Sequence, residues 1–530
     1  MSEATVMDPQ GELFNFAEHL LALNRGHSER LAYVDDHGTL SYGALAQRVR
    51  AVAGALQGQD VRREERVLVL MHDSSDWPCI FLGAMYAGCV PVAANTLLPA
   101  PEYAYMLAKS RAQVALVSQA LLPVLLQAMA LGPHSLRKVV VAHADQSLQS
   151  LPAGCVALED WLAAYPPARH CAATHPNDPG FWLFSSGSTG RPKATVHTQA
   201  NPFWTAKRYG QGVLGLGPQD VCFSAAKLFF AYGLGNALSF PLSVGATTVL
   251  LAERPTPQAV FARLQGAAAG VKPTAFFGAP TLFAAMLAAP NLPAAAALAL
   301  RLVSSAGEAL PADVGQRFLA HFGVDIVDGI GSTEMLHIYL SNRPGQVRYG
   351  TTGWPVPGYD IALRDEAGQP VADGQTGDLF IRGPSAALLY WGDRAKSEET
   401  FQGAWTRSGD KYVRNTDGSY TYSGRSDDML KVSGMYVSPF EVESTLIEHP
   451  AVLEAAVIGV PDEHGLTKTK AYVVCKAGQE VSADELKAFV KDRLAPYKYP
   501  RQIEFIAELP KTATGKIQRF RLRALSAGQA

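Results

Sequence analysis

Short apolar runs alternate with segments of helical periodicity along most of the chain. Glu65–Met71 is predicted to be a buried strand, and Pro78–Ala87 after it a helix. The same rhythm continues in the strand candidates Gln113–Ser118, Lys138–His143, Thr247–Ala252, Thr274–Phe277 and Leu302–Ser304. Strands that alternate with helices predict parallel sheets joined by crossover helices, so the fold class is α/β.

The pattern changes near residue 345, where Gly, Asp and Pro become denser and strands such as Tyr359–Arg364 and Gly377–Arg382 are shorter. A β-rich unit is therefore expected to close a large N-terminal region. A second change falls at the charged segment Gly424–Asp428, which we interpret as a domain boundary and a hinge. The residues beyond it have an α+β pattern of their own, with strands at Val452–Val460 and Lys470–Lys476 and a helix at Ser482–Leu494 that begins with a capping box.

Composition narrows the class of protein. The 530 residues are 48% hydrophobic and 18% charged, and the formal net charge of −2 gives no footprint for nucleic acid or an anionic membrane. The six cysteines are scattered without a CxxC pair, which favours a reduced, cytoplasmic protein over a zinc or disulfide framework. The apolar stretch Leu228–Val244 is too interrupted by Gly, Asn and Pro to span a bilayer, and Met1–Glu12 lacks the basic start of a secretory signal.

The densest chemical segment is Phe184–Lys193, which combines hydroxyls, glycines and two cations after an apolar run. Glycines let backbone N–H groups approach a polyphosphate, hydroxyls donate hydrogen bonds, and Lys neutralises charge. The segment lacks the glycine spacing and the GK[ST] ending of the common P-loop. A flexible surface loop is the plainer alternative.

Four further segments carry weaker signals. Asp328–Glu334 suits Mg²⁺–phosphate binding but also an ordinary helix start. Thr406–Asp410 could present an Asp to ribose hydroxyls or form an Asx turn. The junction Gly424–Gly434 and the basic segment Pro510–Arg519 complete the set.

Taken in order, these segments resemble the adenylate-forming superfamily of acyl-CoA synthetases, non-ribosomal peptide adenylation domains and firefly luciferases, from Phe14 to Arg523. The resemblance implies a large N-terminal domain of two α/β subdomains and a β-barrel-like subdomain (residues 1–424), a hinge (425–428) and a small mobile α+β C-terminal domain (429–530). It also implies a two-step reaction with ATP and Mg²⁺, in which an acyl-adenylate forms and a thiol such as that of coenzyme A then displaces AMP.

Roles follow from the resemblance position by position. The phosphate loop would comprise Ser185, Ser186, Gly187, Ser188, Thr189, Gly190 and Lys193. Catalysis is assigned to Thr333, to Glu334 as the Mg²⁺ carboxylate, and to Lys516 as the adenylation cation. The nucleotide site would comprise Ala306, Gly307, Glu308, Asp328, Gly329, Asp410 and Arg425. The hinge residue is Asp427, and Ser433 and Gly434 fall at the CoA tunnel, although Tyr436 departs from the Arg of some acetyl-CoA synthetases.

Within the superfamily the closest resemblance is to benzoate–CoA ligases of aromatic catabolism. It assigns the acyl substrate to Ala231, Tyr232, Gly331, His337, Ile338 and Lys431. The alternatives are a ligase for another aryl or medium-chain acid, such as 2-aminobenzoate or 4-hydroxybenzoate, a stand-alone adenylation protein that loads a carrier protein, and a non-catalytic nucleotide sensor. A homodimer is left open, and reversible acetylation of Lys516 would bring in a lysine acetyltransferase and a deacetylase.

Overall fold

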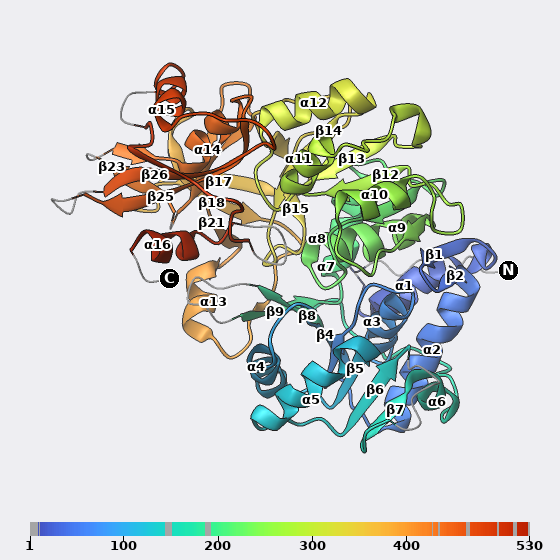
Figure 1. The fold of residues 1–530 in the computed structure, drawn as a ribbon. Helices are drawn as coiled ribbons and strands as arrows, with labels where there is room; N and C mark the ends of the chain where they lie inside the picture. Colours follow the sequence, from blue (N-terminus) through green and yellow to red (C-terminus); the bar gives the residue numbers. More distant parts are fainter. Residues whose placement is uncertain are drawn as a thin grey trace.

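The structure is a computed structural model that describes residues 9, 11–143, 151–185, 192–426, 428–432, 435–462, 467–494, 498–511 and 517–527, and only the backbone of residues 431, 435 and 436. Figure 1 shows two layered α/β units in blue to yellow, with the elements of the C-terminal domain in orange and red at one side. No helix among the described residues has the length and apolar character that crossing a membrane requires.

The first α/β unit is built on an eight-stranded sheet. Its strands, in order across the sheet, are β19 (Leu389–Tyr390), β9 (Lys193–Thr198), β8 (Pro179–Ser185), β4 (Val90–Ala93), β3 (Arg66–Leu70), β5 (Val114–Ser118), β6 (Lys138–Ala142) and β7 (Cys155–Ala157). Helices α1 (Phe16–Leu23), α2 (Tyr42–Gly58), α3 (Asp76–Tyr86), α4 (Ala100–Ser110), α5 (Leu122–Leu131) and α6 (Leu158–Ala163) belong to this unit. The strands from β8 to β7 are parallel, which confirms the predicted crossover arrangement.

A nine-stranded sheet forms the second α/β unit. Its order is β16 (Trp354–Pro355), β15 (Ile338–Ser341), β14 (Ile326–Gly331), β13 (Leu302–Ser305), β12 (Ala275–Gly278), β10 (Val221–Ser224), β11 (Thr247–Val249), β1 (Leu31–Asp35) and β2 (Gly38–Ser41). The accompanying helices are α7 (Asn201–Thr205), α8 (Ala231–Leu234), α9 (Phe240–Val244), α10 (Pro257–Leu264), α11 (Pro280–Ala288) and α12 (Ala312–Phe322). Because β16 still pairs with β15, the change expected near residue 345 falls a little later, at β17.

The apolar stretch Leu228–Val244 becomes an irregular helix rather than a membrane segment. Its middle, Gly235–Ser239, is π-helical between α8 and α9, and Ala206–Gln211 beyond α7 is π-helical as well. Single π-helical turns often occur at functional sites because they displace side chains from regular helical positions. Both segments lie close to the candidate site described below.

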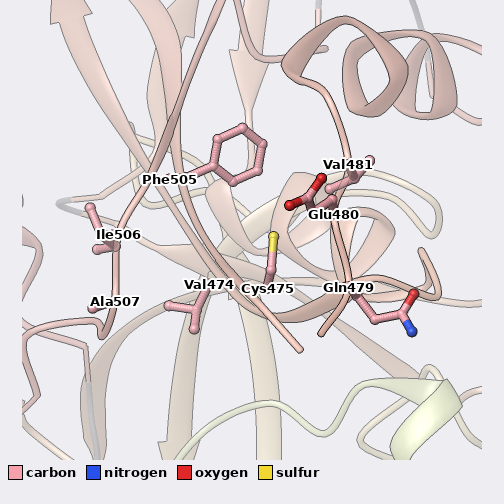
Figure 2. Close-up of a pocket in the computed structure, with 8 residues that line it drawn as sticks. All are labelled: Val474, Cys475, Gln479, Glu480, Val481, Phe505, Ile506 and Ala507. Carbon is pink, nitrogen blue, oxygen red and sulfur yellow. The ribbon is translucent and has the colours of Figure 1, made fainter. Parts of the chain in front are cut away.

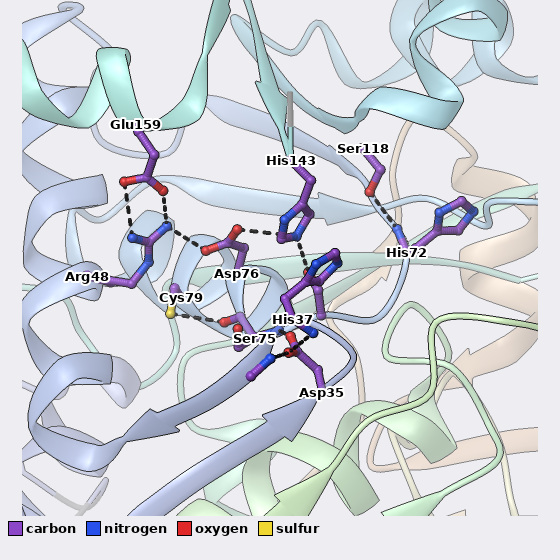
Figure 3. A network of polar contacts seen from close by, with 12 residues as sticks. Asp35, His37, Arg48, His72, Ser75, Asp76, Cys79, Ser118, His143 and Glu159 are labelled. Atoms are coloured by element: carbon purple, nitrogen blue, oxygen red, sulfur yellow. Dashed lines mark hydrogen bonds and ion pairs between the residues drawn. The ribbon is translucent and has the colours of Figure 1, made fainter. Parts of the chain in front are cut away.

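The two α/β units are joined by a polar network around α3 (Figure 3). The Asp35 carboxylate at the end of β1 accepts a hydrogen bond from the Ser75 N–H at 2.7 Å, which links the nine-stranded sheet to α3. Beside it, Arg48 of α2 donates to Asp76 at 2.6 Å and to Glu159 at 2.7 Å. The Asp35–Ser75 hydrogen bond therefore crosses between the units, and the contacts of Arg48 hold α3 and α6 beside α2.

Antiparallel strands follow the α/β units and form the predicted β-rich subdomain. The strands are β17 (Asp360–Arg364), β18 (Thr376–Arg382), β21 (Trp405–Arg414) and β20 (Phe401–Gln402), with β22 (Tyr420–Arg425) paired to β21. Helix α13 (Arg394–Thr400) leads into β20. The turn between β21 and β22 brings the Thr406–Asp410 segment beside Arg425.

The C-terminal domain has two small sheets and cores of its own. Its elements are β23 (Leu430–Val432), β24 (Met435–Val437), α14 (Pro439–Ile447), β25 (Val452–Pro461), β26 (Thr467–Cys475), α15 (Ala483–Lys491), β27 (Gln502–Phe505) and α16 (Arg519–Ser526). The Ser482 hydroxyl caps α15 by accepting from the Glu485 N–H at 3.2 Å, as predicted, while the Glu485 carboxylate lies 3.6 Å from His449. The two buried clusters here contain only residues after 429.

Candidate active site

The two ends of the phosphate-loop segment lie on a pair of antiparallel strands. Strands β8 and β9 pair directly, and Ser185 at the end of β8 lies opposite Lys193 at the start of β9. The intervening residues 186–191 lie outside the described part of the chain, so Ser186, Gly187, Ser188, Thr189 and Gly190 are not placed. The strand pairing brings the two ends of the loop, and therefore a hydroxyl and a cation, to one point.

Four polar side chains meet at that point. Glu334 Oε1 accepts hydrogen bonds from the Tyr390 hydroxyl at 2.6 Å and from the Ser185 hydroxyl at 3.4 Å. Lys193 Nζ donates to the same Tyr390 oxygen at 3.2 Å and lies 3.8 Å from Glu334 Oε1. Burial lowers the pKa of Lys193, and the nearby Glu334 carboxylate opposes that shift. The cluster is a mixed-charge site with three oxygen-bearing side chains.

A buried histidine holds the turn that carries Thr333 and Glu334 through a hydrogen bond to its backbone. His197 Nε2 donates to the Thr333 carbonyl at 2.8 Å, and its Nδ1 accepts from the Asn201 amide at 2.9 Å. This pairing places the proton on Nε2, and burial lowers the pKa of His197 to about 4, so the ring is neutral at pH 7. Leu336, with φ of +67°, lets the chain reverse sharply within the turn.

Five of the predicted nucleotide residues lie around the carboxyl end of β13, where its parallel pairing with β14 ends. Strand β13 pairs with β14 in a register that sets Ser305 opposite Asp328, and Ala306 to Glu308 follow β13 directly. Carboxyl ends of parallel strands are where open α/β sheets bind ligands. Thr281 donates to the Glu308 carboxylate at 2.6 Å, and burial raises the pKa of Asp328 to about 8. Gly307 has φ of +100°, a conformation suited to glycine.

The predicted ribose contacts form an ion pair across the β-rich sheet. Asp410 and Arg425 are register partners on β21 and β22, and Arg425 Nη1 lies 3.2 Å from Asp410 Oδ1. Asp410 is buried, whereas the Arg425 side chain is 45% exposed. Burial is the main cause that lowers the pKa of Lys193, and the positive charge of Arg425 lowers it further. The Asp410–Arg425 pair is therefore close enough to Lys193 to interact with it electrostatically.

Among the predicted acyl residues, Tyr232 packs against the buried ring of His337. His337 is flanked by Phe240, with ring centroids 4.5 Å apart, and by Tyr232 at 5.4 Å. Its Nε2 donates to the Tyr232 carbonyl at 3.3 Å, and burial lowers its pKa to about 3, so this ring is neutral too. Tyr232 donates its hydroxyl to Ser304 at 3.2 Å, and Tyr232 and the adjacent Ala231 are only partly buried.

Glycines allow this turn to pack closely. A Cβ on Gly331 would lie 2.6 Å from the His337 carbonyl oxygen, and a Cβ on Gly235 would lie 2.3 Å from the His337 ring. Ile338 follows at the start of β15 and is buried. Phe229 is also buried, in the hydrophobic core.

Several predicted residues are not placed. Lys516, Asp427, Ser433 and Gly434 lie outside the described residues, and the side chain of Lys431 does as well. Among the residues that are described, the structure brings Ser185, Lys193 and Glu334 into direct contact. The turn from Thr333 to His337 then connects this polar cluster to the aromatic residues.

Three contributors to the site were not predicted. Tyr390, His197 and Asn201 lie outside the motifs read from the sequence. The position of His197 was a usable signal, because it lies four residues after Lys193 on the same strand, and residues an even number of positions apart share a face. No sequence signal indicated Tyr390, which reaches the site only because β19 pairs with β9.

Two cavities lie outside the polar cluster. A cavity of about 490 Å³ in the C-terminal domain is lined by residues of β26, the turn before α15, and β27 (Figure 2). A second, of about 330 Å³, lies between α1 and α2. Among the described residues, no group of three or more His, Cys, Asp and Glu side chains could hold a metal by itself.

Comparison with known proteins gives consistent results across the chain. The sequence profile of the AMP-binding enzyme family matches residues 22–391, and that of the AMP-binding enzyme C-terminal domain matches residues 441–516. The chain is 54% identical to a benzoate–CoA ligase of Thauera aromatica (97% of this chain, 96% of the relative) and 45% identical to a 4-hydroxybenzoate–CoA/benzoate–CoA ligase of Rhodopseudomonas palustris (97% and 94%). A solved benzoate CoA ligase from Burkholderia xenovorans LB400 superposes with a TM-score of 0.89 at 56% identity (96% and 100%).

Proposed function

The chain belongs to the AMP-binding enzyme family, and from that premise we propose that it is an ATP-dependent, AMP-forming ligase that joins benzoate to coenzyme A. One observation carries the proposal: a single turn, Thr333 to His337, connects the Ser185–Lys193–Glu334 cluster to a wall of aromatic rings. An enzyme that adenylates an aromatic acid needs this juxtaposition, because the carboxylate must meet the α-phosphate while the ring stays in an apolar slot.

The reaction has two halves. The benzoate carboxylate attacks the α-phosphorus of ATP, which forms the mixed anhydride benzoyl-AMP and expels pyrophosphate. The CoA thiol then attacks the carbonyl carbon and AMP leaves, since AMP is a far better leaving group than a carboxylate oxygen. In the first half Lys193 and the loop hydroxyls would hold the β- and γ-phosphates, and Lys516 would offset the charge that develops between carboxylate and α-phosphate.

The residues at the cluster fit a magnesium ion that arrives with ATP. Mg²⁺ is typically bound through one or two carboxylates together with substrate phosphates and water, and Glu334 supplies one carboxylate beside the hydroxyl oxygens. Bound there, the ion would neutralise phosphate charge. Glu334 is the side chain that would hold it, and Thr333 would contact the phosphates.

Selection of benzoate rests on the neutral rings of the slot. His337 is buried with its charge suppressed, and Tyr232, Phe240 and Ile338 add apolar surface. No cation or carboxylate among Ala231, Tyr232 and His337 would pair with a charged ring substituent. The second candidate is a broader aryl–CoA ligase, which is favoured by the relative that is named for both 4-hydroxybenzoate and benzoate.

The second half-reaction requires the C-terminal domain to move. We place the boundaries at residues 1–424, 425–428 and 429–530, with Asp427 as the hinge and Ser433 and Gly434 at the CoA tunnel. The separate buried clusters after residue 429 support this division. Within the hinge segment, Asp428 lies 3.7 Å from Arg519 and 2.5 Å from Arg523, so ion pairs link α16 to the hinge.

The cellular setting belongs to the same proposal. A benzoate–CoA ligase would act in the cytoplasm, where ATP and CoA are supplied, and would start aromatic catabolism. A homodimer and control by an acetyltransferase and a deacetylase at Lys516 are compatible with it.

A panel assay tests the function. The protein is incubated with ATP, Mg²⁺ and CoA, and with benzoate, 2-aminobenzoate, 4-hydroxybenzoate or hexanoate in turn. Acid-dependent pyrophosphate and the CoA thioester are measured, and benzoate is expected to give the highest kcat/KM. Pyrophosphate without thioester would favour a carrier-protein acceptor, and no pyrophosphate with any acid would refute the ligase.

A further inference from the structure

Tyr390 stands at the centre of the polar cluster although it belongs to a distant part of the chain. It lies in the two-residue strand β19, which pairs with β9 so that Tyr390 is opposite Thr195, two positions from Lys193. Its backbone N–H donates to the Ser397 hydroxyl at 2.9 Å, and its ring packs 5.3 Å from that of Phe401. The residue is 2% exposed, so strand pairing and packing fix its position.

The phenol occupies the space between two opposite charges. Its oxygen donates to Glu334 Oε1 at 2.6 Å and accepts from Lys193 Nζ at 3.2 Å, and its ring centroid lies 4.5 Å from the same Nζ. The two charged atoms are 3.8 Å apart, which is longer than a hydrogen bond. The ammonium of Lys193 can only donate, and the carboxylate of Glu334 accepts, so the phenol oxygen bridges the two charges as acceptor and donor.

Without this oxygen, the Lys193 ammonium and the Glu334 carboxylate would close to a direct ion pair. The two side chains are only 18% and 15% exposed, so water would screen such a pair poorly. ATP would then have to break it before Lys193 could bind a phosphate and Glu334 could serve the accompanying cation.

We propose that Tyr390 is a positioning residue for adenylation, which holds Lys193 and Glu334 side by side but apart, so that both charges are available to the triphosphate and its magnesium ion. This inference rests on the proposed function. It adds to that function a residue outside every motif of the sequence, and it predicts that the phenol oxygen acts in the first half-reaction alone.

The test is Tyr390→Phe, which retains the ring over Lys193 and removes only the oxygen. Loss of a hydrogen bond to a charged group corresponds to a change of about 10- to 100-fold. The rate of benzoyl-AMP formation is expected to fall by this factor. The Kd of MgATP, measured by calorimetry without any acid, is expected to rise by the same factor. The KM for benzoate and the conversion of supplied benzoyl-AMP to benzoyl-CoA should stay within about 2-fold, because neither needs the two charges apart.

Tyr349→Phe is the matched control. It also removes a tyrosine hydroxyl that donates to a carboxylate, that of Asp325 at 2.9 Å, but Tyr349 is not part of the polar cluster. Wild-type MgATP affinity and adenylation rate in Tyr390→Phe would overturn the inference, and so would an equal loss of both half-reactions. The double variant Tyr390→Phe/Glu334→Gln should form benzoyl-AMP less than about 3-fold more slowly than Glu334→Gln alone. Full additivity of the two losses in adenylation rate would also refute the inference. A wild-type protein that bound MgATP but did not activate benzoate would instead reject the proposed substrate, and the calorimetric comparison would still decide on Tyr390.

Discussion

Gly235→Ala should impair the use of benzoate through a single added methyl group. The new Cβ would lie 2.3 Å from His337 Cδ2 and 2.6 Å from His337 Nε2, whereas ordinary contacts are 3.4–4 Å. The backbone at Gly235 has φ of −62°, which suits alanine, so the effect is purely steric. The imidazole cannot retreat, because Phe240, Tyr209 and Tyr232 surround it at ring distances of 4.5, 5.5 and 5.4 Å.

Overpacking of this kind costs about 1–3 kcal/mol. If the displaced ring takes up space that the acid needs, kcat/KM for benzoate should fall roughly 5- to 150-fold. The Kd for MgATP should change little, since the loop and the Asp410–Arg425 pair are not touched. The assay is acid-dependent pyrophosphate release, with a thermal unfolding curve for each variant. Gly26→Ala is the control, because a Cβ there meets nothing within 4 Å.

A double-mutant cycle shows whether the effect passes through His337. In His337→Ala the clashing ring is gone, so adding Gly235→Ala should cost less than about 3-fold more. Full additivity of the two losses would refute the reasoning, as would unchanged benzoate kinetics in a normally stable Gly235→Ala protein. In either case His337 would not line the acyl slot.

Four further predictions concern other parts of the proposed machinery. Lys516→Ala, or acetylation of Lys516, should reduce benzoyl-AMP formation about 10²–10³-fold while supplied benzoyl-AMP still yields benzoyl-CoA, and equal loss of both half-reactions would contradict the assigned role. Asp427→Pro should leave adenylation and abolish thioester formation, because proline fixes φ near −65°, and full CoA transfer in this variant would exclude the hinge. Ala231→Leu should lower kcat/KM for benzoate, and Ala231→Gly should reduce the difference in kcat/KM between benzoate and 4-methylbenzoate. The same ratio of the two kcat/KM values in wild type and both variants would show that position 231 does not line the slot. Burial raises the pKa of Asp328 from 3.8 to about 8, so the folded chain retains this proton, and the contribution of Asp328 to stability is complete below pH 4 and lost as the pH rises to about 8. Asp328→Asn should flatten the decline of the unfolding free energy between these limits in urea titrations, and parallel wild-type and Asp328→Asn curves would count against the shift.

The sequence by itself determined the local features of this protein. The apolar runs at residues 65–71, 113–118 and 138–143 became β3, β5 and β6, because burial on both faces of a parallel sheet requires continuous hydrophobic stretches. The Ser482 cap of α15 likewise needs only residues three positions apart. The phosphate-loop motif is local as well, and its composition predicts anion binding.

The tertiary structure alone decided which distant side chains complete the site. Tyr390 reaches Lys193 across 197 residues, and His197 supports Thr333 across 136, because β19 adds to the edge of β9 and the turn after β14 folds over it. Periodicity records how each segment is buried but not which strand becomes its neighbour. Those neighbours are set by the packing of whole sheets, so contacts such as that between the Gly235 backbone and the His337 ring exist only once the chain has folded.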